Sequence, residues 1–181
     1  MLAFWFARKR VFSSLFLFLF SCIACCPPCH QWQIAIIKAD CPPATYVKTY
    51  LPATNTFSGM EVELMCHNGC LNLYLNAITL QFPTTNPKQT ELKIVVCDQT
   101  YIFLAERLNG GQRLLLPDDA KQLVICSLLE ENCVKIYAGR YETTVTDEGF
   151  AKTYNDLVRA CYPTSFQSLQ STDQQTTVDC G

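Results

Sequence analysis

The chain is poor in the residues that enzymes commonly use for catalysis. Its 181 residues include two histidines, His30 and His67, and nucleophilic catalysis needs a histidine or another base within reach of the nucleophile. The sequence also lacks the Gly-x-Ser-x-Gly, His-Glu-x-x-His and Ser-x-x-Lys motifs and any glycine-rich phosphate loop. These absences favour a protein that is not an enzyme and that uses no cofactor.

Basic residues are also scarce once the N-terminal cluster Arg8-Lys9-Arg10 is set aside. The chain has 14 lysines and arginines against 16 acidic residues, and 11 against 16 without that cluster. Domains that bind nucleic acids present a basic patch or stripe to the phosphate backbone. We therefore expect no nucleic-acid partner.

The main apolar run is too short for a typical transmembrane helix. It extends over the sixteen residues from Val11 to Cys26, before Pro27 and Pro28 end any helix, whereas a span needs about 20 residues. A basic cluster, a short apolar run and small residues at its end are typical of a signal peptide. We expect residues 1–21 to direct export; an uncleaved signal anchor over Val11 to Cys26 is the alternative.

The end of this run, Leu19-Phe20-Ser21-Cys22, resembles the lipobox of bacterial lipoproteins. The resemblance covers residues 1–22 and implies cleavage before Cys22, a diacylglycerol on its thiol and usually an acyl chain on its new amine. Because each buried methylene contributes ~0.8 kcal/mol, two or three chains give lasting attachment. The resemblance therefore implies an exported domain that a covalent lipid holds at the cell membrane or outer membrane.

Cys25 is a second candidate for lipidation, since Ile23 and Ala24 precede it. Cleavage before Cys22 leaves 11 unlipidated cysteines of the chain's 12, whereas cleavage before Cys25 leaves 10, which can all pair. In an exported protein, cysteines are expected to form disulfides. The cysteine- and proline-rich residues 22–31 are interpreted as a stiff spacer.

From Trp32 onward the pattern is typical of β-structure. Aromatic and β-branched segments alternate with turn signals such as Asn68-Gly69. They predict strands over 32–39, 45–51, 60–66, 70–82, 91–97, 100–106, 112–116, 121–129 and 133–145. The apolar alternation changes phase after Ala77, which indicates a bulge. This spacing predicts an antiparallel sandwich-like or barrel-like domain over residues 32–164.

One helix is predicted near the C-terminus, followed by a polar, flexible tail over residues 165–181. Asp147 can cap the helix, and Pro163 ends it. The apolar residues Phe150, Tyr154, Leu157, Val158 and Cys161 lie on one helical face. We expect this helix to pack across one end or edge of the sheet.

Cys66, His67 and Cys70 form the most suggestive cluster in the domain. A three-residue hairpin loop would place Cys66 opposite Cys70 at a distance that suits a disulfide. The alternative is a metal or catalytic site that includes His67 and needs further ligands. Asp98, Asp118 and Asp119 at strand ends could bind calcium, but aspartate is also a common turn residue, and we predict no metal site.

These observations together predict a non-catalytic binding or structural domain. Its membrane attachment is the covalent lipid, and its partner is an envelope protein or the cell wall.

Overall fold

The computed structural model describes residues 30–40, 43–67 and 69–162. They form an antiparallel β domain with a C-terminal helix, which confirms the predicted fold class. The predicted signal peptide, the lipidation candidates Cys22 and Cys25, most of the spacer and the polar tail lie outside these residues.

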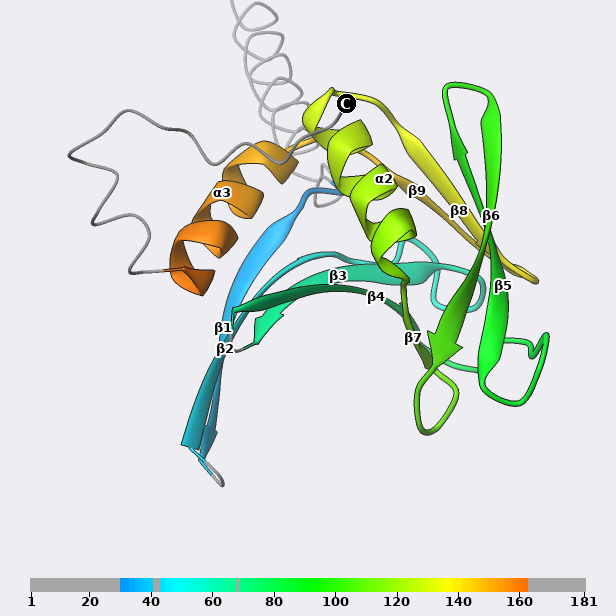
Figure 1. The fold of residues 1–181 in the computed structure, drawn as a ribbon, viewed down its shortest axis with the longest axis horizontal. Helices are drawn as coiled ribbons and strands as arrows, with labels where there is room; N and C mark the ends of the chain where they lie inside the picture. The colour runs from blue at the N-terminus through cyan, green and yellow to red at the C-terminus, as the bar shows by residue number, and fades with distance from the viewer. Residues whose placement is uncertain (1–29, 41–42, 68, 163–181) are drawn as a thin grey trace, which may run out of the picture.

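The described residues form one sheet of nine strands in the order β1-β2-β3-β4-β7-β6-β5-β8-β9. Their bounds are β1 Gln33–Asp40, β2 Pro43–Leu51, β3 Met60–His67, β4 Cys70–Ala77, β5 Gln89–Val96, β6 Gln99–Arg107, β7 Arg113–Leu115, β8 Val134–Ala138 and β9 Tyr141–Val145. Every neighbouring pair is antiparallel. The sheet is continuous and strongly bent, so that β3 and β4 run beneath helix α2 while β8 and β9 run beside it (Figure 1).

The core lies on one face of this bent sheet. Side chains alternate between the two faces of a strand, and Val62, Leu64, Leu73 and Leu75 are buried on the inner face of β3 and β4. The inner face is covered by α2 (Asp118–Leu129) and α3 (Phe150–Cys161). No helix among the described residues is long and apolar enough to cross a membrane.

The strand predicted over residues 121–129 is wrong, because this segment is part of α2. Pro117 precedes the helix, and Asp118 and Asp119 in its first turn suit the positive end of the helix dipole. The buried residues recur at helical spacing: Ala120, Val124, Ile125, Ser127 and Leu128. The apolar, β-branched stretch was compatible with either structure, and packing against the sheet selects the helix.

Two further strand predictions differ from the structure. Residues 133–145 form a hairpin by themselves, since β8 and β9 are joined by the two-residue turn Gly139-Arg140. Strand β4 ends at Ala77, where the Ala77 amide donates to the Gln112 carbonyl. The phase change after Ala77 therefore marks the end of a strand and not a bulge.

The predicted C-terminal helix is confirmed as α3. It packs across β1, β2 and β3 at one end of the sheet. Its N-terminus differs from the prediction, because Gly149 is the cap residue and none of the described side chains caps the helix. Asp147 contributes its backbone carbonyl, which accepts a hydrogen bond from the Phe150 amide at 2.8 Å.

Trp32 joins the start of β1 to the segment that leads into α3. Its indole Nε1 donates to the Thr146 carbonyl at 2.8 Å, and its ring lies 4.9 Å from the ring of Phe150. Within β9 itself, the Glu142 amide donates to the carbonyl of Ser58, just before β3, at 3.0 Å. These contacts hold the two ends of the bent sheet near one another.

Candidate functional site

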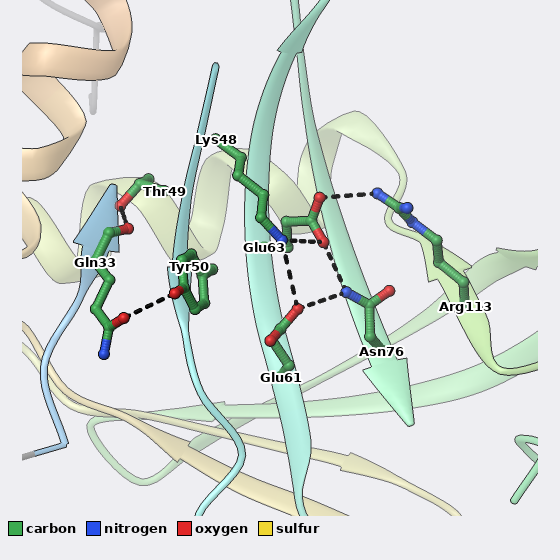
Figure 2. A network of polar contacts seen from close by, with 8 residues as sticks. All are labelled: Gln33, Lys48, Thr49, Tyr50, Glu61, Glu63, Asn76 and Arg113. Carbon is green, nitrogen blue, oxygen red and sulfur yellow. Dashed lines mark hydrogen bonds and ion pairs between the residues drawn. The ribbon is translucent and has the colours of Figure 1, made fainter. Parts of the chain in front are cut away.

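A cluster of charged side chains occupies the outer face of the sheet (Figure 2). It draws on four adjacent strands: Lys48 from β2, Glu61 and Glu63 from β3, Asn76 from β4 and Arg113 from β7. The strand register places them on one face, because Glu61 is paired with Asn76 and Asn76 with Arg113. Their face is opposite to the one that carries Val62 and Leu64.

Glu63 is the centre of this cluster, and its side chain is only 6% exposed. One carboxylate oxygen accepts from Arg113 Nη2 at 3.1 Å. The other accepts from Asn76 Nδ2 at 2.8 Å and lies 3.5 Å from Lys48 Nζ. A buried charge is tolerated when it is paired and hydrogen-bonded, and Glu63 meets both conditions.

The cations of the cluster are also engaged by aromatic rings. The Arg113 guanidinium lies 3.9 Å from the ring centroid of Tyr74, and Lys48 Nζ lies 4.7 Å from that of Tyr50. Such cation–π contacts fix the position of a charge that is partly open to solvent.

The cluster is suited to holding strands together and not to catalysis. Two acids and two bases give it no net charge, and both Glu63 oxygens already have partners. A general acid or base needs to reach a substrate proton, whereas Glu63 is covered by its own neighbours. The alternating polar residues of Glu61-Val62-Glu63 and Asn72-Leu73-Tyr74-Leu75-Asn76 are the sequence signal that could have indicated this outer face.

The structure does not bring Cys66, His67 and Cys70 together as one site. Cys66 forms a disulfide with Cys161 of α3, and Cys70 is a free, exposed thiol. The hairpin turn has two residues and not the expected three, since His67 is paired with Cys70 and Cys66 with Leu71. A shift of one residue reverses the face of every side chain, so Cys66 and Cys70 lie on opposite faces.

His67 lies with Cys70 on the outer face, and its ring is 4.8 Å from that of Tyr46. It is exposed. The predicted Cys66–Cys70 disulfide is therefore wrong, and the alternative site is divided between the two faces of the sheet.

The acidic turn residues also lie in separate places. Asp98 occupies the β5–β6 turn with φ +64°, whereas Asp118 is paired with Lys121 at 2.6 Å in the first turn of α2. The hydrogen bond and charge of Lys121 lower the pKa of Asp118. Within residues 30–40, 43–67 and 69–162, no three His, Cys, Asp or Glu side chains are placed to hold a metal ion.

One side of β6 carries no neighbouring strand over most of its length. Residues Gln99 to Glu106 of β6 are paired with β5, whereas β7 is paired only with Glu106 and Arg107. The Arg107 amide donates to the Lys88 carbonyl on the β5 side. Because such bonds alternate along an antiparallel ladder, Thr100, Ile102 and Leu104 direct their backbone groups away from β5.

This open segment, Thr100–Ala105, is called the β6 edge below. It contains no charged residue, and three of its apolar side chains are exposed: Tyr101 36%, Ile102 56% and Leu104 46%. Long apolar edges favour pairing with another strand, and proteins usually protect them with charges or prolines. The described part of the chain provides no strand that covers the β6 edge.

No protein-family model, curated protein sequence or solved structure matches this chain. The features available for a functional assignment are therefore its sequence pattern, its disulfide-linked β domain, the outer polar cluster and the β6 edge.

Proposed function

We propose that the chain is an exported lipoprotein of the cell envelope with a non-catalytic binding or structural β domain. The observation that carries this proposal is Leu19-Phe20-Ser21-Cys22 at the end of a short apolar run. In this proposal a diacylglycerol on Cys22, or on Cys25, holds the domain at the cell membrane or outer membrane.

The cysteine chemistry of the domain supports export. Cys66 and Cys161 form a disulfide, and Cys126 of α2 is also disulfide-bonded. Disulfides persist in oxidising compartments and are rare in the cytosol of most organisms. The closed, charge-balanced cluster around Glu63 supports the non-catalytic part of the proposal.

Mass spectrometry of the N-terminal peptide tests the anchor. The full-length protein is purified from membranes and compared with Cys22→Ala and Cys25→Ala variants. We expect a peptide that begins at Cys22 and carries the mass of a diacylglycerol, and we expect Cys22→Ala to abolish it. A peptide that begins at Cys25 would select the second candidate, whereas an unmodified peptide that begins at Met1 would replace the proposal with a signal anchor.

The β6 edge is the surface through which we expect the domain to bind, and its partner in this proposal is a second copy of the chain. An antiparallel pairing centred on Ile102 places the uncharged segments of two copies against each other. Tyr101 then lies opposite Phe103 of the copy, and Thr100 opposite Leu104. Attachment of both copies to one membrane raises their effective concentration.

A cysteine at the centre of the pairing tests this contact directly. Two Ile102→Cys chains would place their Cα atoms about 5.5 Å apart, within the range of a disulfide. We expect the full-length variant, oxidised in detergent, to give a covalent dimer on a non-reducing gel. Ile78→Cys is the control, because Ile78 is similarly exposed at 52% and lies outside β6.

The dimer band should be absent from the unmodified chain and from Ile78→Cys. Monomeric Ile102→Cys, or equal dimer bands from both variants, would remove the β6 contact from the proposal and leave the lipid anchor unaffected.

A further inference from the structure

Two free cysteines lie at corresponding ends of neighbouring strands. Strands β5 and β8 are paired in regular register from Lys93 with Tyr137 to Val96 with Val134. The next residue on β5 is Cys97, and the residue before Val134 is Cys133. The pairing ends there, and one further step of the same register would bring Cys97 opposite Cys133.

The backbone around Cys97 turns its thiol toward the second segment. Cys97 and Asp98 form the two-residue turn between β5 and β6, with φ +47° and +64°. Left-handed φ values at both positions define the turn type that suits a tight hairpin. Cys97 Sγ lies 3.4 Å from Asn132 Oδ1, within hydrogen-bond distance of the residue that precedes Cys133.

The segment that carries Cys133 is also held in place. It follows α2, and the Glu130 amide donates to the Cys126 carbonyl while the Asn132 amide donates to the Ser127 carbonyl at 2.9 Å. Glu131 has φ +62°, the left-handed conformation that often ends a helix. Both cysteines thus lie on ordered backbone, and both are exposed.

We propose that Cys97 and Cys133 are a disulfide-forming pair that links the tip of the β5–β6 hairpin to the segment after α2. Residues opposite one another in an antiparallel ladder have Cα atoms about 4.5 to 5.5 Å apart, which is within the range that a disulfide bridges. The exposure of both thiols gives an oxidising partner access to them.

The reaction is thiol–disulfide exchange with a disulfide donor, such as an oxidised thiol–disulfide oxidoreductase. One thiolate attacks a sulfur of the donor and forms a mixed disulfide, and the second thiolate then displaces the donor. Two protons and two electrons leave the cysteine pair, and the donor's disulfide becomes two thiols. The bond would hold the tip of the β5–β6 hairpin against the segment that leads into β8.

Peptide mapping without reduction tests the pair. The full-length protein is incubated with oxidised glutathione as the donor, its remaining thiols are alkylated, and it is digested with trypsin and a glutamate-specific protease at mildly acidic pH. Cleavage after Lys93 and Glu106 releases one peptide, and cleavage after Glu131 and Lys135 releases the other. We expect these peptides to be joined, with a mass two hydrogens below their sum.

Two variants and one natural control define the result. Cys97→Ser and Cys133→Ser should each abolish the joined peptide, and exposed Cys70 should stay outside it. The inference is overturned if Cys97 and Cys133 are each alkylated or carry one glutathione without any joined peptide, or if either is joined to Cys70. The lipid anchor is not involved in this experiment, so the two proposals can fail separately.

Discussion

Glu63 is the residue whose loss would affect the most strands at once. Replacing it with alanine leaves Lys48 and Arg113 without their shared carboxylate. Because hydrogen bonds to charged groups contribute about 1.5 to 3 kcal/mol, we expect Glu63→Ala to lower the unfolding free energy by about 2 kcal/mol. Urea denaturation would measure this.

Glu61→Ala is the matched control on the same strand. The Glu61 side chain is more exposed and lies 3.9 Å from Lys48, and exposed ion pairs contribute about 0 to 1 kcal/mol. Equal losses in the two variants would contradict the central position of Glu63.

Gly139 allows the turn between β8 and β9 to lie against Pro83. Its φ is +61°, and a Cβ added there would overlap the Pro83 ring. Left-handed backbone costs a non-glycine residue about 1 to 2 kcal/mol, and overpacking adds about 1 to 3 kcal/mol. Gly139→Ala should therefore lower the melting temperature more than Gly110→Ala, because Gly110 has φ +87° but open space around it. Similar decreases in melting temperature for the two variants would show that Pro83 can move away from the added methyl group without loss of stability.

Tyr154 links stability to alkaline pH. Burial, with a further contribution from the Tyr162 phenol, raises the pKa of Tyr154 above its ordinary value of 10.0. The folded state therefore favours the neutral phenol. Its contribution to the unfolding free energy is complete below pH 10.0 and is lost as pH rises through the pKa of the folded state. The unfolding free energy of Tyr154→Phe, measured from about pH 9 to 11, should fall less steeply than that of the unmodified chain. If the unfolding free energies of the two proteins fell in parallel with pH, the contribution of Tyr154 would be contradicted.

At the level of elements, the Cys66–Cys161 disulfide secures α3 to β3 across a sequence separation of 95 residues. Closing a loop of this length restricts the unfolded chain, so removal of the bond should lower the unfolding free energy by about 3 to 5 kcal/mol. The variant Cys66→Ala/Cys161→Ala would show this loss in denaturant under non-reducing conditions. Cys70→Ala should change the midpoint little, since Cys70 is free and exposed.

Local patterns predicted the elements whose cause is local. Asn68-Gly69 indicated a hairpin, and the spacing from Phe150 to Cys161 indicated α3, because turn chemistry and helical periodicity are contained in the segment itself. Residues 121–129 were ambiguous, since their apolar run suits a buried strand as well as a buried helix. The predicted hairpin loop after Cys66 has three residues, whereas the structure has a two-residue turn. The difference of one residue places Cys70 on the sheet face opposite to the predicted one.

The outer cluster and the disulfide could not be read from the sequence, because their members are distant along the chain. Arg113 and Glu63 are 50 residues apart and meet only because β7 is inserted between β4 and β6. Cys161 has several possible cysteine partners, and spacing alone does not select among them.

For the whole molecule, the short strand β7 is the connection between two parts of the sheet. Its three residues all pair with β4 on one side, and two of them, Leu114 and Leu115, also pair with β6 on the other. The two parts also meet where the Tyr141 hydroxyl donates to the Leu80 carbonyl at 2.7 Å and where Glu142 meets Ser58. The bent sheet is therefore held at its middle and again where its ends approach.

The Cys66–Cys161 bond also determines what a protease can release. The chain between these residues includes the exposed loop that ends at Lys88, and exposed loops are preferred sites of cleavage. A single cut after Lys88 would give two fragments that stay covalently joined. Limited trypsin digestion should therefore leave one band without reductant and two with it, and a domain cleaved once in this way would remain one molecule.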